Sequence, residues 1–235
     1  MIRRVILSLA LFSFAGVALA QSPALVPGKT TQWVEGRNYF RIDTPQPPPI
    51  PGKIEVTEVF SYACPVCWRF LPYANRIKQA LPPNAYMDYL PVSFNPVEDF
   101  PVFQRAFYAA QALGVEEKTH DAMFKAVHSP GGPLATYDAA TNRLKNPLPD
   151  INDIAKWYAQ YGVKPADFIA TANSFAVNTK MKRADALVKA YGVDGTPTMV
   201  VAGKWRYDMG SAGGPEQVVQ LTKYLVAREA AAMKQ

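Results

Sequence analysis

The sequence predicts an α/β fold with a helical segment inserted between its strands. Two short runs rich in β-branched and aromatic residues, 54–60 and 85–94, flank a helical stretch, and helical patterns then occupy residues 99–191. Strand character returns at 198–207, before a last helix. Strands that alternate with helices indicate a sheet covered by helices.

The first elements follow from composition and periodicity. Residues 38–42 are expected to form an edge strand, and the proline-dense segment 44–51 (TPQPPPIP) favours an extended connector outside the sheet. The run 54–60 (IEVTEVF) predicts a buried strand. A helix should follow and end at 81–84 (LPPN). Its core-facing stripe consists of apolar residues at helical spacing: Val66, Phe70, Tyr73 and Ile77.

Residues 85–94 predict a second core strand, after which the chain becomes helical. Six helices are expected there, at 99–113, 116–127, 135–144, 151–161, 165–173 and 175–191. The basic run 180–183 (KMKR) should lie on a solvent-exposed helix face. The remaining elements are expected in this order: a hairpin at 198–207 that turns at Gly203-Lys204, a loop at 210–215 and a helix at 215–233.

Composition and the N-terminal residues indicate an exported globular protein. Hydrophobic residues make up 49% and charged residues 19%, and the net charge of +6 is spread without a nucleic-acid-binding signature. Arg3-Arg4, a following apolar run and Ala18-Leu19-Ala20 predict a secretory signal cleaved after Ala20. A membrane anchor is disfavoured because no basic stop-transfer flank follows. The mature protein is therefore expected in an oxidising compartment.

These elements group into four predicted segments. They are a signal peptide (1–20), an N-terminal extension with the Pro-rich connector (21–52), an α/β domain made of two pieces (53–95 and 192–235), and an inserted helical subdomain (96–191).

Cys64 and Cys67 are the only cysteines, and they lie where the first predicted core strand ends and a helix begins. The unpaired N–H groups and positive dipole of a helix N-terminus stabilise a thiolate, so Cys64 should be unusually acidic. Pro65 suits the first helical turn. Two cysteines three residues apart on a helix lie within disulfide reach. The pair is therefore predicted to be a redox-active disulfide.

A structural staple, a zinc site and a haem attachment site fit the C-x-x-C pattern less well. As a staple, so small a loop would stabilise the fold by only roughly 2 kcal/mol. A zinc site lacks ligands, because His120 and His128 have the wrong spacing and no second cysteine pair exists. Haem attachment needs histidine where Trp68 stands. We expect neither a metal nor a cofactor.

Glu58 is a second candidate catalytic residue. It shares strand parity with Val56 and Phe60, so its side chain should point into the core near the cysteines. Burial would raise its pKa and let it exchange protons with Cys67. The alternative is a strand-end glutamate that reaches solvent. Three more residues are expected to serve core packing: Trp68, Met199 and Trp205.

Three features together resemble the DsbA family of periplasmic thiol:disulfide oxidases, which have a thioredoxin-like fold. They are FSYACPVCWRF, the helical insertion and GVDGTPTMVVAGKW. The resemblance implies that Cys64 is the reactive cysteine and that Cys67 is buried and resolves the mixed disulfide. It also implies that Pro197 is a cis-proline facing the disulfide, and that Thr196 offers its backbone to the substrate.

The resemblance further implies reduced exported polypeptides as substrates and reoxidation by a DsbB-type quinone-linked enzyme of the inner membrane. We expect a monomer. Two positions depart from the family pattern. Pro65-Val66 stands between the cysteines, where well-known members have histidine second, and Tyr89 falls where a lysine would pair with the buried acid. The alternatives are an isomerase or dedicated reductase of the same fold, or a chaperone-like binding module.

Overall fold

The computed structural model describes residues 32–233. The predicted signal peptide and residues 21–31 of the predicted extension lie outside the described residues. Within the described part, no helix combines the length and the apolar character needed to cross a bilayer.

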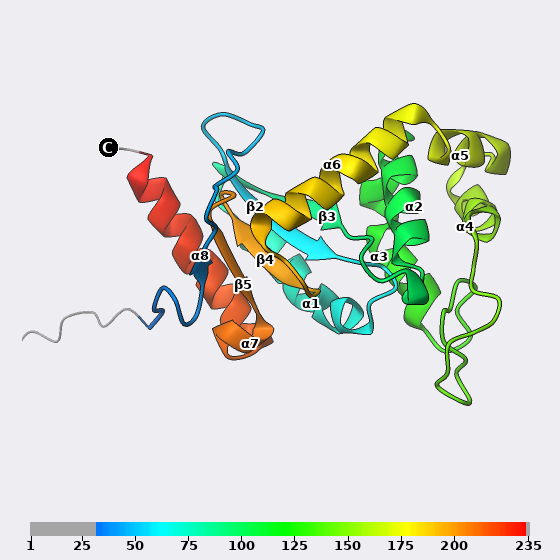
Figure 1. Ribbon diagram of the computed structural model, residues 1–235, viewed down its shortest axis with the longest axis horizontal. Coiled ribbons are helices and arrows are strands. Elements are labelled where there is room, and N and C mark those ends of the chain that lie inside the picture. Colours follow the sequence, from blue (N-terminus) through cyan, green and yellow to red (C-terminus); the bar gives the residue numbers. More distant parts are fainter. Residues whose placement is uncertain (1–31, 234–235) are drawn as a thin grey trace, which may run out of the picture. The chain divides into compact units, whose positions relative to one another are not determined.

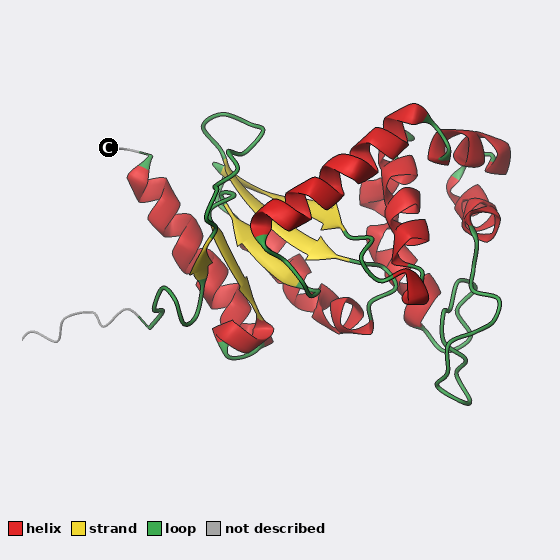
Figure 2. Cartoon of the chain, in the orientation of Figure 1, coloured by secondary structure: helices red, strands yellow, loops and turns green. Residues whose placement is uncertain are grey.

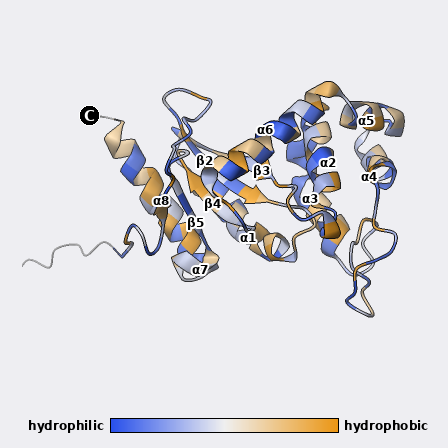
Figure 3. Ribbon diagram, in the orientation of Figure 1, coloured by the Kyte–Doolittle hydropathy of each residue, from blue (hydrophilic) through white to orange (hydrophobic). Residues whose placement is uncertain are grey.

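A five-stranded sheet forms the centre of the described chain, in the order β1-β5-β4-β2-β3 (Figures 1 and 2). β2 and β3 are parallel, and every other neighbouring pair is antiparallel. All residues of the central strands β2 and β4 are buried, and β4 is mostly hydrophobic (Figure 3), whereas β2 also carries the buried polar residues Glu55, Thr57 and Glu58. The strands are β1 (Phe40–Arg41), β2 (Ile54–Phe60), β3 (Ala85–Pro91), β4 (Thr198–Val201) and β5 (Trp205–Asp208).

Helices cover both faces of the sheet (Figure 1). α1 (Pro65–Ala80) and α8 (Pro215–Ala232) cover one face, where Val56 of β2 shares a core cluster with Phe70 of α1. α6 (Phe175–Tyr191) covers the other face, where Val200 of β4 shares a cluster with Val188. β2 contributes to both cores, with Ile54 and Val56 in one and Val59 and Phe60 in the other, which explains why the whole strand is buried.

Helices also form the segment between β3 and β4, as the sequence predicts. They are η1 (Pro96–Glu98), α2 (Phe100–Ala112), α3 (Glu116–His128), α4 (Ile151–Tyr158), η2 (Ala159–Tyr161), α5 (Pro165–Ala172) and α6. Three residues of the basic run on α6 are exposed, as expected: Lys180, Lys182 and Arg183.

The predicted helix at 135–144 is wrong, because this segment is a folded loop. The Asp138 carboxylate accepts hydrogen bonds from the N–H groups of Ala140 and Thr141, at 3.1 and 2.8 Å. Asn142 adopts a left-handed conformation with φ of 52°. A short side chain that bonds to its own backbone competes with helix formation, and it does so here.

Three further expectations need correction. The predicted loop 210–215 begins with a short helix, α7 (Met209–Ala212), because Asp208 and Ser211 form a capping box around it. β3 ends at Pro91 and is an edge strand, half-buried over 85–89, rather than a core strand. In the predicted stripe of α1, Phe70 and Ile77 are buried as expected, whereas Val66 and Tyr73 are only half-buried, and Cys67 is buried in addition.

Candidate active site

Cys64 is the N-cap of α1, four residues beyond the end of β2. Its backbone is extended (φ −77°, ψ 115°), and its Sγ accepts a hydrogen bond from the Cys67 N–H at 3.4 Å. Pro65 follows at the first helical position, where its missing N–H costs nothing. The predicted change from strand to helix at the cysteines is confirmed.

The surroundings of Cys64 lower the pKa of its thiol to about 6. The largest cause is a hydrogen bond from the Cys67 thiol, and burial opposes it. The Thr196 hydroxyl and the backbone N–H groups of Cys67 and Val66 also stabilise the thiolate. The two backbone donors are the free N–H groups of the first helical turn, so the helix N-terminus contributes as expected.

Cys67 lies one turn deeper, with 0% of its surface exposed. Burial raises the pKa of its thiol well above the ordinary value, and the neighbouring Cys64 and Glu58 add to this. Both cysteines are free thiols in this structure, so the geometry is that of the reduced site. Two thiols three residues apart thus differ sharply in acidity.

Thr196 and Pro197 approach the cysteines from the loop before β4. The Thr196-Pro197 peptide bond is cis, as the resemblance implies. The Thr196 carbonyl oxygen lies 3.6 Å from the Cys64 Sγ and accepts its hydrogen bond. α6 ends at Tyr191 and is capped by Gly192, whose left-handed backbone (φ 65°) starts this loop. A segment 132 residues away in sequence thereby reaches the reactive sulfur.

Glu58 is 1% exposed, on the face of β2 that meets α1. Its pKa is raised to about 8, first by burial and then by the charges of Cys64 and Asp121. Its Oε2 has no hydrogen-bond partner among the described residues. The predicted inward orientation is confirmed, and the solvent-reaching alternative is excluded.

Aromatic residues occupy the place where a cation could have paired with Glu58. Tyr89 of β3 lies opposite Glu58 in the parallel ladder, and its ring stacks on His120 with centroids 4.1 Å apart. The His120 Nδ1 is 2.9 Å from the Tyr62 hydroxyl. No three His, Cys, Asp or Glu side chains of residues 32–233 group as a metal site. Sequence reasoning missed His120 and Tyr62, because only the fold brings His120 against Tyr89 and Tyr62 against His120.

A histidine, His128, contacts both the segment before α1 and the first turn of α1. The His128 Nε2 lies 2.7 Å from the Tyr62 carbonyl oxygen, and its ring stacks on Trp68 with centroids 6.1 Å apart. Burial lowers the pKa of His128, so its neutral form is favoured. Trp68 is half-buried against the core, whereas Met199 and Trp205 are fully buried, as expected.

This site and fold are similar to those of known proteins. The family model described as "DSBA-like thioredoxin domain" matches residues 74–225. A thiol:disulfide interchange protein DsbA of Pseudomonas aeruginosa is 38% identical over 202 residues, covering 86% of this chain and 88% of the relative. The chain belongs to the DsbA family.

Solved structures agree with this assignment. The crystal structure of Pseudomonas aeruginosa DsbA has a TM-score of 0.74 at 37% identity, covering 86% of this chain and 97% of that one. The oxidoreductase DsbA of Xylella fastidiosa has a TM-score of 0.73 at 34% identity, covering 84% and 98%. The thioredoxin-like fold with a helical insertion is therefore confirmed, and the protein is a dithiol-disulfide oxidase of the DsbA type.

Proposed function

We propose that the protein oxidises client polypeptides by passing on a Cys64–Cys67 disulfide. A client thiolate attacks the Sγ of Cys64, the bond between the two cysteines breaks, and Cys67 leaves and takes up a proton. A second client thiolate then attacks the client sulfur of the mixed disulfide, and Cys64 leaves as a thiolate. The client loses two electrons as its disulfide forms, and the protein is left as a dithiol.

The observation that carries this proposal is the difference in pKa between the two thiols. Cys64 has a pKa of about 6, so it is ionised at neutral pH and is a good leaving group in the second step. The buried Cys67 has a raised pKa, so its thiolate is costly and takes a proton readily. This asymmetry stabilises the reduced protein and favours donation of the disulfide.

Glu58 serves as the proton carrier for Cys67 in this scheme. Its carboxyl is protonated below a pKa of about 8 and lies beside the cysteines, as their mutual influence on pKa indicates. A protonated carboxyl can supply the proton that the departing Cys67 needs. Thr196 would bind the client backbone, and its position against the Cys64 Sγ supports that role.

The partners and the compartment follow from the family. Reduced exported polypeptides would be the clients, and a DsbB-type quinone reductase of the inner membrane would accept the two electrons. The predicted signal peptide supports a periplasmic location. We also propose that the protein acts as a monomer.

Equilibration of the pure protein with glutathione buffers tests the proposed function. Stabilisation of the Cys64 thiolate should give an oxidising potential. The DsbA family itself provides the benchmark of about −120 mV, whereas thioredoxin lies at about −270 mV. A value near the thioredoxin end would contradict the oxidase and favour a dedicated reductase.

The remaining alternative is a binding module whose cysteines are incidental. Replacement of both Cys64 and Cys67 by serine separates the two functions, because a binding module would still suppress aggregation of an unfolded client. An oxidase without its cysteines forms no client disulfides. The thiol content of the client measures disulfide formation, and light scattering by the client measures suppression of aggregation.

A further inference from the structure

A cleft of about 540 Å³ runs along β3, at the free edge of the sheet. Every residue of 85–89 lines it and is half-buried, in contrast to the fully buried β2. The opposite wall comes from α3, and the floor from the turn between α1 and β3. In the described chain β3 has β2 as its single neighbour, so its other side offers backbone groups to this cleft.

The hydrogen bonds of the parallel ladder show which groups these are. The Ile54 N–H bonds to the Asn84 carbonyl oxygen, and the Val92 N–H bonds to the Phe60 carbonyl oxygen, both at 2.9 Å. In a parallel ladder alternate residues bond to the same neighbour. The even-numbered residues of β3 therefore bond to β2, and the odd-numbered residues direct their backbone groups away from it.

Protein groups already satisfy part of this edge near its two ends. The Ala85 N–H bonds to the Pro82 carbonyl oxygen at 2.9 Å. The Pro91 carbonyl oxygen accepts from the Gln104 side chain at 3.1 Å. Met87 and Tyr89 are left as the β3 residues that offer both an N–H and a C=O to the cleft, and Met87 lies in the middle of the strand.

The cleft is strongly acidic. Four carboxylates line it, against one ammonium group, and that ammonium group of Lys78 already pairs with Glu117 at 3.4 Å. The carboxylates belong to Asp88, Glu116, Glu117 and Asp121. His120 also lines the cleft. It is 3% exposed, and its Nε2 has no hydrogen-bond partner among residues 32–233. An acidic wall and an open strand edge together specify an occupant that is both extended and basic.

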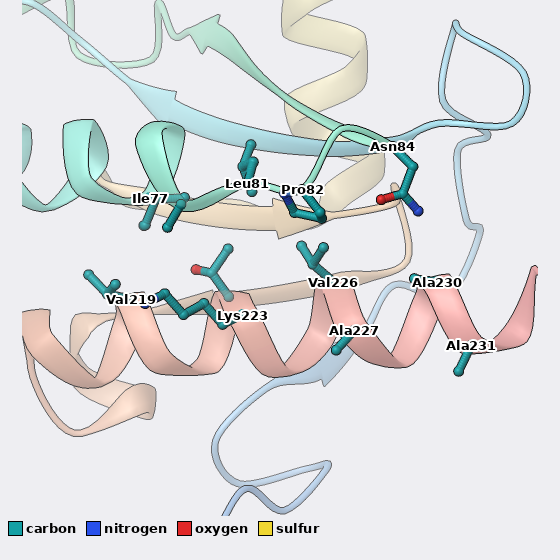
Figure 4. A pocket seen from close by; sticks show the side chains of 12 residues that line it. Ile77, Leu81, Pro82, Asn84, Val219, Lys223, Val226, Ala227, Ala230 and Ala231 are labelled. Carbon is teal, nitrogen blue, oxygen red and sulfur yellow. The ribbon is translucent and has the colours of Figure 1, made fainter.

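A second copy of this chain fits poorly, because it would bring the same four carboxylates against these. A different cleft, of about 860 Å³ between α1 and α8 (Figure 4), is lined mainly by apolar residues and has neither a strand edge nor an acidic wall. β2, the neighbour of β3, leads directly to Cys64, and Glu58 lies opposite Tyr89 at one end of the acidic cleft. The cleft thus adjoins the redox site.

We propose that the edge of β3 binds an extended, basic segment of a client polypeptide as an added strand. This choice of occupant rests on the proposed function, since a client that has not yet folded is extended and can pair with an open edge. Backbone hydrogen bonds at Met87 would give affinity regardless of client sequence, and the carboxylates would select basic segments. Binding needs no cysteine in the segment.

A cysteine-free peptide of alternating Lys and Val tests this proposal without any redox step. Titrated into the full chain, it should shift the backbone amide NMR signals of Met87 and Tyr89, and its affinity should fall as salt is added. The matched peptide of alternating Glu and Val should not bind. Shifts confined to another surface, or equal binding of both peptides, would overturn the proposal.

Met87→Pro is the decisive variant, with Met87→Ala as its control. Proline removes the N–H that faces the cleft and leaves the ladder to β2 intact, and edge strands accept it. Loss of one such bond should weaken peptide binding about tenfold in the proline variant and leave the alanine variant near the parent. Equal affinities in all three proteins would refute strand addition.

A charge variant keeps the proposal testable if Met87→Pro does not fold. Asp121→Asn combined with Glu117→Gln should weaken binding of the Lys-Val peptide and flatten its salt dependence, and an unchanged salt dependence would contradict the acidic wall. The two proposals can fail independently. Glutathione equilibration would reveal failure of the redox proposal, and binding of the Lys-Val peptide would be unaffected by that failure.

Discussion

Cys64 and Cys67 lie one helical turn apart, yet their surroundings shift the pKa values of their thiols in opposite directions. Cys64 receives hydrogen bonds from the Cys67 thiol, the Thr196 hydroxyl and the helix N-terminus, and its pKa falls to about 6. Cys67 is fully buried, and its pKa rises. The difference shows that a short motif acquires two chemical roles from the position of each residue at the start of the helix, rather than from the residue type.

The largest expected effect comes from removing one cysteine at a time. Cys64→Ser should abolish disulfide donation, because the attacked sulfur is gone. Cys67→Ser should leave Cys64 able to attack a disulfide and should accumulate mixed disulfides, because no thiol resolves them. Mass spectrometry of the two variants with a disulfide-bonded peptide provides the measurement. Mixed disulfides in Cys64→Ser alone would reverse the assignment of roles.

The two redox forms should differ in how their stability depends on pH. The folded pKa of Cys64 is lowered to about 6, so its contribution is fully present above the unfolded value of 9.0 and is lost as pH falls through 6. Glu58 has a raised pKa of about 8 in the reduced form, so its contribution is present below 4.5 and lost as pH rises through 8; burial, the largest cause, does not depend on the redox state of the cysteines.

The stability of the reduced form minus that of the oxidised form should therefore rise with pH between 6 and 9. Three pKa units set an upper limit of ~4 kcal/mol on the change. Urea unfolding of both forms at several pH values measures it. A difference that stays flat over this window would mean that Cys64 is an ordinary thiol.

Glu58→Gln should slow disulfide exchange below pH 8, because an amide cannot supply the proton that Cys67 takes up. General acid–base catalysis typically contributes roughly a hundredfold. The two rates should converge above pH 8, where the parent carboxyl has lost its proton. Stopped-flow fluorescence with a dithiol peptide gives the rates.

Glu55→Gln is the matched control for this experiment. Glu55 lies on the same strand, is also buried, and has a pKa raised to about 7 by burial and Asp88, but its side chain faces away from α1 toward Tyr86. Its replacement should leave exchange unchanged. If the two variants slow exchange equally, then loss of a buried carboxyl, and not proton supply to Cys67, is responsible.

Val66→His should give the smallest of these effects. Val66 contributes only its backbone N–H to the Cys64 thiolate, and a half-exposed histidine in its place would add a second donor that is often cationic. The Cys64 pKa should fall, and the potential should rise by about 30 mV for each unit. Val66→Ala controls for lost packing. A fixed potential with a lowered pKa would break this coupling.

Local patterns were sufficient to predict the centre of the site. Strand parity placed Glu58 inside, and the change from a β-branched run to helical spacing placed Cys64 at a helix start. Thr196 and Pro197 lie far away in sequence, and only the family resemblance connected them to the cysteines. Strands and helices whose own residues specify them were predicted in nearly correct positions.

The errors arose where a side-chain hydrogen bond, the order of the strands or packing between distant segments decided the structure, rather than composition and periodicity. The Asp138 side chain took the backbone bonds of a segment with helical composition. The run 85–91 is apolar enough for a core strand, and only the order of strands in the sheet makes it an edge. His120 of α3 meets Tyr89 of β3 and the Tyr62 hydroxyl through packing between α3 and the sheet, and no spacing in the sequence signals these contacts.

The most direct test follows the thiolate of Cys64 by its ultraviolet absorbance as reduced protein is titrated. The parent should show one transition near pH 6, and Cys67→Ala should move it upward, because the Cys67 thiol is the largest single cause of the lowered pKa. A transition near the ordinary cysteine value of 9.0 in the parent, or an identical transition in Cys67→Ala, would contradict the division of roles between the two cysteines.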